Sequence, residues 1–170
     1  MLQIDGTSTD GAPTARQRWL RLLSHAPLEL LESAIGTLAG PNPQWLRRPE
    51  TGLVMVQGRI GGTGARFNLG EVTVTRCALR TDPARIACRE VGVAYVLGRS
   101  GRHAELAATA DALLQDSSAR THVPADLLEH ISAWLENKHA KRRAQAHATR
   151  VEFFTIARES AGEPAAQEAP

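Results

Sequence analysis

The sequence contains little of several residue types that define common protein classes. Only two of its 170 residues are cysteines, Cys77 and Cys88, which excludes a disulfide scaffold and a structural zinc site built on CxxC pairs. Aromatic residues make up 4%, so stacking platforms for single-stranded nucleic acid are scarce. The longest apolar run, VGVAYVL at residues 91–97, is far shorter than the roughly 20 residues of a membrane span. These shortages favour an ordinary soluble globular protein.

Lysine is almost absent as well. It occurs only at Lys138 and Lys141, so nearly all of the 20 basic residues are arginine, and the net charge is only +2. The planar guanidinium group pairs well with carboxylates and phosphates and is favoured at interfaces. The bias therefore points either to an interface rich in arginine or to a skewed genome composition.

The two ends of the chain differ in composition from its middle. The N-terminal MLQIDGTSTDG has neither a basic region nor an apolar core, so we expect no signal peptide, a cytoplasmic location and reduced thiols. Residues 1–13 and 159–170 have the composition of a disordered lead-in and a disordered tail. The length of the chain then predicts a single domain over residues 14–158.

Apolar spacing predicts two short helices at the start of this domain. Trp19, Leu22, Leu23 and Ala26 form one stripe of helical period, and Pro27 interrupts it. A second stripe consists of Leu28, Leu31, Ile35 and Leu38 and ends before Gly40 and Pro41. The short joint predicts a sharply bent helix pair.

The period then changes to that of strands. The sequence predicts a buried strand over residues 53–56, a turn at 60–64, a second strand over 72–77, a turn at 81–84 and a third strand over 86–97. If the second turn closes evenly, Arg80 faces Arg85 and Cys77 faces Cys88. Such a cysteine pair is either a redox switch or, as the cytoplasm favours, two small buried residues.

The second half of the chain predicts two more helices and a last strand. Apolar positions of helical period run from His103 to Leu114, and a fourth helix begins at Val123 and Pro124 and continues to about Ala148. The sequence VEFFTI at 151–156 predicts a strand. The fold class is therefore α+β, an antiparallel β-meander with an N-terminal helix pair and two later helices packed on the sheet.

Motifs for self-sufficient chemistry are missing. The sequence has no P-loop, no GxGxxG and no HExxH, and HAE at 103–105 is not followed by the PCxxC of zinc deaminases. We therefore assign no catalytic residue and no metal site. His103 lies on the apolar side of its helix, as a core residue or near a ligand. The nearby carboxylates Glu105 and Asp111 are expected to be solvated.

Two basic segments remain as binding candidates. The glycine-rich stretch at 58–64 is either a flexible hairpin tip or a loop whose backbone N–H groups contact a phosphate or a partner. The basic run at 138–143 is either a solvated helix face or a contact for a phosphate or an acidic partner. The candidate phosphate or partner contacts are Arg47, Arg48, Arg59, Gly61, Gly62, Arg66, Arg76, Arg99 and His103. Each arginine could instead form a surface ion pair of small value.

Four ordered segments resemble one protein family. They are LRRPETGLVMVQGRIGG at 46–62, FNLGEVTVTRC at 67–77, YVLGR at 95–99 with HAE at 103–105 and DALLQ at 111–115, and TRVEFFT at 149–155. Together with the opening helix they are similar to PhnG, a subunit of the bacterial carbon–phosphorus lyase core complex, over residues 14–158.

The resemblance implies a function that spacing alone does not give. PhnG-like chains assemble in the cytoplasm, two copies per complex, with PhnH, PhnI and PhnJ, and act with PhnL. The set displaces adenine from ATP with an alkylphosphonate. ATP is thus a substrate of the complex, and no cofactor is expected on this chain alone. The implied role is that of a subunit without independent activity. The alternatives are an arginine-rich nucleic-acid-binding or adaptor module, which the low aromatic content disfavours, and an independent enzyme, for which no motif speaks.

Overall fold

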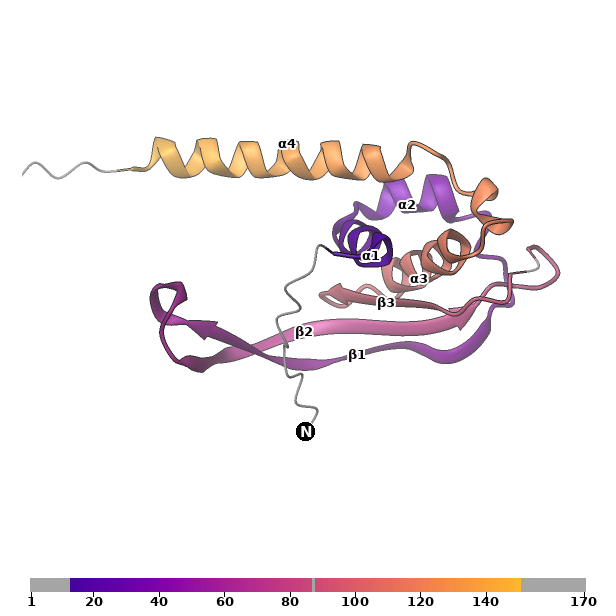
Figure 1. Cartoon of the computed structure of the whole chain (residues 1–170), viewed down its shortest axis with the longest axis horizontal. Helices are drawn as coiled ribbons and strands as arrows, with labels where there is room; N and C mark the ends of the chain where they lie inside the picture. The colour runs from indigo at the N-terminus through magenta and orange to yellow at the C-terminus, as the bar shows by residue number, and fades with distance from the viewer. Residues whose placement is uncertain (1–12, 87, 151–170) are drawn as a thin grey trace, which may run out of the picture.

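The structure, a computed structural model, describes residues 13–86 and 88–150, and places helices against one face of a three-stranded antiparallel sheet of order β1-β2-β3 (Figure 1). This confirms the predicted α+β class and the meander. The elements are α1 (Ala15–His25), α2 (Leu28–Ile35), β1 (Gln44–Arg59), β2 (Arg66–Arg80), β3 (Gly92–Leu97), α3 (Gly101–Gln115) and α4 (Leu127–Ala148), with 3-10 turns η1 (Ile60–Gly62) and η2 (Ala119–His122).

The N-terminal helix pair forms as its apolar spacing predicts. Thr14 and Gln17 cap the start of α1 reciprocally, each side chain bonding the other's backbone N–H. Pro27 separates the helices, and Leu23 and Leu31 are fully buried in the core. The second helix ends at Ile35, earlier than Leu38. The N–H groups of residues 38 and 39 both donate to the carbonyl of residue 35, so the chain forms a turn here and the helix does not continue.

Helix α3 is the centre of the core. Ser100 caps its first turn, and almost every side chain from His103 to Leu114 is buried against the sheet, α1 and α2. Its many alanines let the sheet approach closely. At Gly92 of β3, a Cβ atom would collide with the backbone of Ala108, so this position requires glycine.

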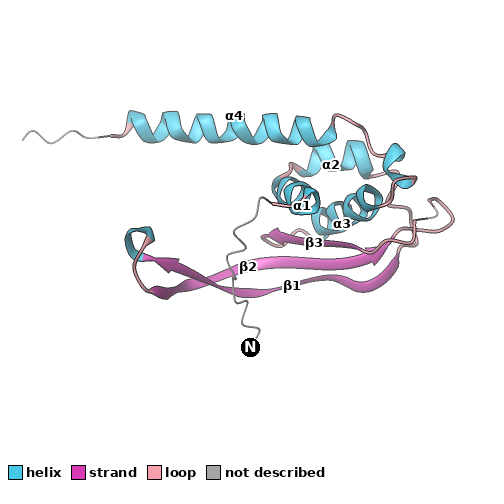
Figure 2. Cartoon of the chain, viewed as in Figure 1, coloured by secondary structure: helices cyan, strands magenta, loops and turns pink. Residues whose placement is uncertain are grey.

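The strands differ in length from the prediction. β1 and β2 contain 16 and 15 residues, whereas β3 contains only six. The two long strands therefore continue beyond the end of β3 as a two-stranded hairpin (Figure 2). Irregular register shifts around Arg47 and Glu50 accommodate Pro49, which an edge strand tolerates.

The predicted pairing of Cys77 with Cys88 is wrong. Cys77 lies opposite Ala94, and Arg80 lies opposite Gln44 of β1. The residues after β2 do not continue as a strand, because Asp82 accepts N–H groups of the following residues through its backbone and side-chain oxygens. Because of this loop, β3 begins at Gly92 and not at residue 86 as predicted. Both cysteines are buried and free.

Helix α4 begins at Leu127, a few residues later than predicted, and packs mainly against α1. Its first turns bury Leu127 and Ile131, but from residue 139 every side chain up to 150 is exposed. The predicted strand at 151–156, the predicted tail and residues 1–12 of the predicted lead-in lie outside the described residues. No helix in the described part of the chain is both long and apolar enough to cross a membrane.

Candidate functional site

The most unusual surface is the part of the β1–β2 hairpin that extends beyond β3. The last pair between β2 and β3 joins Val74 to Leu97, so the structure describes no third strand beside residues 53–73. We call this segment the distal hairpin. Figure 1 shows it projecting away from α1, α2 and α3, in the same direction as the C-terminal half of α4.

The distal hairpin exposes large apolar side chains. The exposed fractions are 63% for Leu53, 48% for Met55, 76% for Ile60, 42% for Phe67 and 63% for Leu69. The predicted burial of residues 53–56 is therefore wrong, because no helix or strand among the described residues covers them. Monomeric soluble proteins rarely expose contiguous apolar patches of this kind, and such patches mark interaction sites.

No element in the described part of the chain covers the sheet face opposite α3, which we call the uncovered sheet face. Directly paired residues of an antiparallel sheet share a face, and the pairs Arg76 with Tyr95 and Val74 with Leu97 therefore lie together. Tyr95 is 61% and Leu97 65% exposed, while Ala94 and Val96 on the other face are buried. On this face Val54 of the distal hairpin continues the exposed surface, whereas Leu53 and Met55 lie on the other face of the sheet.

Two of the predicted arginines meet on the uncovered sheet face. Arg47 and Arg76 both bond the same oxygen of Glu50, with 2.6 Å between Arg76 Nε and Glu50 Oε1. Arg47, and then Arg76, hold the pKa of Glu50 below its usual value. Nearby, the Arg48 guanidinium lies over the Trp45 ring at 5.9 Å from its centroid. These arginines are thus held in fixed positions by their neighbours.

Four other candidates gather at the hairpin tip. Arg59 and Arg66 are opposite one another in the register, and Arg59 Nη1 donates to the Gly64 carbonyl at 3.3 Å. Gly61 and Gly62 have φ angles of 59° and 80°, which explains why glycine occupies both positions. The tip therefore presents two guanidinium groups next to exposed apolar side chains, and residues 53–70 include no acidic residue.

The last two candidates lie apart from the tip. Arg99 is exposed just after β3, whereas His103 is buried and its Nε2 donates to the Leu23 carbonyl at 2.8 Å. The imidazole thus joins α3 to α1. No sequence pattern distinguishes the exposed apolar residues from core residues, because a run such as LVMV is also typical of a core strand.

The expected solvation of Asp111 is wrong. Its carboxylate is fully buried and accepts four hydrogen bonds, from Arg16 Nε and Nη2, Trp19 Nε1 and the Val93 backbone N–H. Asp111 also raises the pKa of Arg16. Every bond of this carboxylate is used to join α1, α3 and β3, so its role is structural. Within the described residues no group of three or more His, Cys, Asp or Glu side chains is placed to hold a metal ion.

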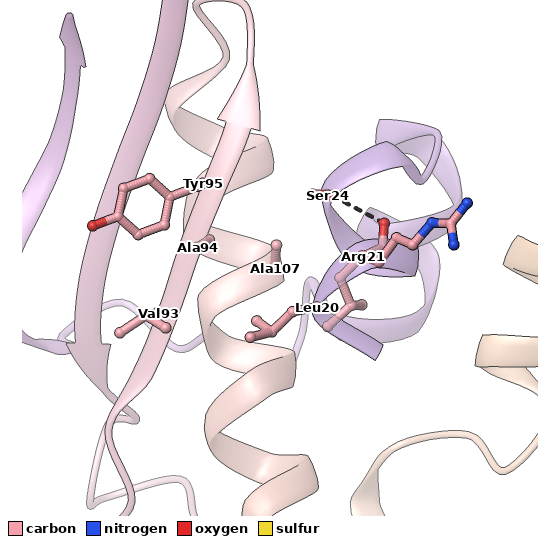
Figure 3. Close-up of a pocket in the computed structure, with 8 residues that line it drawn as sticks. Leu20, Arg21, Ser24, Val93, Ala94, Tyr95 and Ala107 are labelled. Atoms are coloured by element: carbon pink, nitrogen blue, oxygen red, sulfur yellow. Dashed lines mark hydrogen bonds between the residues drawn. The ribbon is translucent and has the colours of Figure 1, made fainter. Parts of the chain in front are cut away.

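A pocket of about 240 Å³ lies between α1, α3 and β3 (Figure 3). Its lining is mostly apolar, and Arg21 supplies the only charged side chain among the residues that form it: Leu20, Arg21, Leu23, Ser24, Val93, Ala94, Tyr95 and Ala107. Acid–base or nucleophilic chemistry would need further titratable groups here.

The fold and this surface define a class: an α+β protein whose exposed apolar hairpin and sheet face suit it to assembly with other chains. The sequence profile of the family described as "Phosphonate metabolism protein PhnG" matches residues 14–159, and the chain belongs to this family. A relative from Rhizobium meliloti (strain 1021) is named alpha-D-ribose 1-methylphosphonate 5-triphosphate synthase subunit PhnG. The two chains are 40% identical over 159 residues, which cover 93% of this chain and 98% of the relative.

Proposed function

We propose that this chain is a subunit of an alpha-D-ribose 1-methylphosphonate 5-triphosphate synthase. In that role it supports the transfer of an alkylphosphonate to C1 of the ATP ribose with release of adenine, as part of phosphonate catabolism in the cytoplasm. The observation that carries the proposal is the 40% identity, over nearly the full length of both chains, to a subunit with that name. ATP is then a substrate of the assembled enzyme, and this chain alone binds no cofactor.

The geometry supports a role in assembly. The distal hairpin exposes apolar side chains that gain stability when a partner removes them from water, at roughly 25 cal/mol for each Å² buried. Arg59 and Arg66 at its tip would pair with carboxylates or phosphates at the partner's surface. PhnH, PhnI, PhnJ and PhnL are the proposed partners, with two copies of this chain in the complex.

Reconstitution tests this function directly. The chain is purified alone and, separately, co-expressed with PhnH, PhnI, PhnJ and PhnL, and adenine release from ATP and methylphosphonate is measured. We expect release only from the assembled set, and a loss of release when this chain is omitted. Adenine release by the purified chain alone would contradict the subunit role.

The hairpin tip is tested with Arg59→Ala. Loss of the guanidinium removes a charged contact at the tip, so we expect weaker co-purification with the partners and slower growth on methylphosphonate. Arg120→Ala, at an exposed position in η2 and outside the distal hairpin, is the matched control. Wild-type assembly and growth of the Arg59→Ala strain would remove this residue from the interface.

The alternative function, nucleic-acid binding, receives little support from the basic residues of α4. The basic residues of α4 are exposed, but Lys138 lies over the Trp134 ring at 4.5 Å, so the chain's own cation covers the aromatic face that a base would use. Binding of RNA that weakens steeply with salt would favour this alternative.

A further inference from the structure

Within residues 13–86 and 88–150, the outer edge of β3 has backbone hydrogen-bonding groups without a partner. Gly98 donates its N–H to Thr73 of β2, whereas the Val93 N–H points away from β2 to Asp111. Because backbone groups of successive residues alternate sides, those of Tyr95 and Leu97 point away from β2 as Val93 does. Such an edge is a template for another strand. Val93 is already bonded by Asp111, so the free stretch is centred on Tyr95.

The pocket lies beside this edge. In Figure 3 it opens between β3 and α1, with Ala107 of α3 behind it and Ser24 and Arg21 on the far side. A strand added to β3 would direct every second side chain towards α3. Cavities smaller than this one, at about 150 Å³, accommodate a benzene ring. The pocket therefore has the size and the apolar lining for an aromatic side chain of an added strand.

The chain itself contains a segment suited to this edge. Residues 151–156, VEFFTI, follow α4 directly, lie outside the described residues and have the β-branched and aromatic composition of a strand. Phe153 and Phe154 are adjacent, so in a strand they point to opposite faces. One of them therefore faces α3 in either register.

The direction of α4 determines which copy receives the segment. The last residue of α4 that packs on the core is Leu135, and the helix continues to Ala148, which takes the chain about 20 Å further. Figure 1 shows this half of α4 projecting past the end of β3. Six extended residues span at most about 20 Å, so a return to the chain's own β3 would use the whole segment. Pairing with the β3 edge of another molecule is not restricted by this reach.

We propose that residues 151–156 of one copy add as a strand to β3 of a second copy, with a phenylalanine in the pocket beside α1. Because each chain contains both the segment and the edge, a reciprocal exchange closes a two-fold dimer. This inference goes beyond the proposed function, and its test measures association and not adenine release, so the two can fail separately.

A backbone substitution tests the edge. Proline at position 95 removes the N–H that faces outward and leaves the β2 ladder unchanged, because edge strands tolerate proline on their free side. We expect Tyr95→Pro and a chain ending at Arg150 each to weaken the dimer at least tenfold in sedimentation equilibrium. Tyr95→Ala, which keeps the N–H, is the matched control and should weaken it less. A wild-type chain that is monomeric at all concentrations, or an unchanged Tyr95→Pro dimer, would overturn the proposal.

Cross-linking identifies the source of the strand and does not depend on how well the proline variant folds. Two full-length chains with different tags, one with Tyr95→Cys and the other with Phe153→Cys or Phe154→Cys, are co-expressed with the synthase partners and oxidised. The native thiols are buried and interfere little. We expect a disulfide between the two tagged chains and none when Leu53→Cys replaces Tyr95→Cys. Cross-links that form only when a single chain carries both substitutions, or only with a partner subunit, would refute the exchange between copies.

Discussion

At the scale of single residues, Asp111 is the most heavily bonded side chain of the core. It is fully buried and joins α1, α3 and β3 through Arg16, Trp19 and the Val93 backbone. A buried carboxylate of this kind is costly to remove, because the Trp19 indole N–H and the Val93 N–H lose their acceptor and the partly exposed Arg16 guanidinium loses its ion pair. The pocket beside α1 depends on the same junction.

The first prediction concerns this carboxylate. We expect Asp111→Ala to lower the free energy of unfolding by about 1–3 kcal/mol, since an indole N–H and an amide N–H would lose their acceptor and the partly exposed Arg16 would lose its ion pair. Urea denaturation followed by circular dichroism measures the change. Asp126→Ala removes an exposed carboxylate and should stay within about 0.5 kcal/mol of the wild type. Equal effects for the two variants would contradict the structural role of Asp111.

The second prediction concerns the cysteines. Burial raises the pKa of Cys77 to about 12 and also raises the pKa of Cys88. Only about one Cys77 thiol in ten thousand is then ionised at pH 8, and the thiolate is the reactive form. We expect neither thiol to react rapidly with Ellman's reagent in the native chain, and both to react in urea. An exposed thiol introduced by Ser33→Cys is the positive control. Rapid labelling of Cys77 or Cys88 in the native chain would contradict this prediction and favour a redox switch.

The third prediction follows from Glu50. Arg47 and Arg76 lower its pKa from an ordinary value of 4.5. A carboxylate whose pKa is lowered in the folded chain stabilises the fold at pH values above its ordinary pKa. This stabilisation disappears as the pH falls through the pKa of the folded state. The melting temperature of Glu50→Gln should therefore lie below that of the wild type at pH 7 and approach it near pH 3. Glu71→Gln is the control on the same hairpin, and a gap that widens in acid would contradict this account.

At the scale of elements, the distal hairpin is a strand pair without a core of its own. Two-stranded hairpins are marginally stable in water, yet this one continues the ladder of a three-stranded sheet, with one register shift between Val56 and Gln57. Leu53 and Met55 lie on the face that α3 covers further along the sheet, and here they are exposed. Their contribution to stability is therefore expected to come from a partner.

The fourth prediction separates folding from assembly. The double variant Leu53→Ser with Met55→Ser removes apolar surface that is already in water, so we expect a change in unfolding free energy of less than about 1 kcal/mol. Co-purification with the synthase partners should fall at least tenfold, because the hydrophobic gain of assembly is lost. Leu46→Ser, at an exposed apolar position outside the distal hairpin, is the control. Normal assembly of the double variant would exclude this face from the interface.

At the scale of the whole molecule, two elements project from one packed centre. The centre consists of α1, α2, α3 and the part of the sheet that they cover, and the distal hairpin and the second half of α4 extend from it (Figure 1). Residues that contact little of the centre contribute little to its stability, so folding and assembly should depend on different parts of the chain.

The fifth prediction tests this division. A chain that ends at Lys138 lacks the exposed half of α4 and everything after it, and we expect its melting temperature to stay within a few degrees of the wild type. Its self-association should be lost. Ile131→Ala, which opens a cavity under the first half of α4, should cost about 2–5 kcal/mol. Unfolding of the truncated chain would show that the C-terminal residues complete the core.

The helices and the class of the fold follow from local sequence patterns alone. Apolar stripes such as Leu23 with Ala26 and Leu106 with Leu113 specify buried helical faces, because the period of 3.6 residues is a local property. The β-branched run at 72–77 predicted the central strand, because strand-forming composition is also a local property of the sequence. The family, too, is a property of the ordered motifs and needs no coordinates.

Which residues are buried and which are exposed depends instead on the packing of distant segments. An apolar strand such as residues 53–56 has the same sequence pattern in a core and at an interface, and only the short β3 leaves it exposed. The loop at Asp82 moved Cys88 away from Cys77, and the meeting of α1 with β3 buried Asp111. Burial and pairing depend on contacts between residues distant in the chain, and local periodicity carries no information about them.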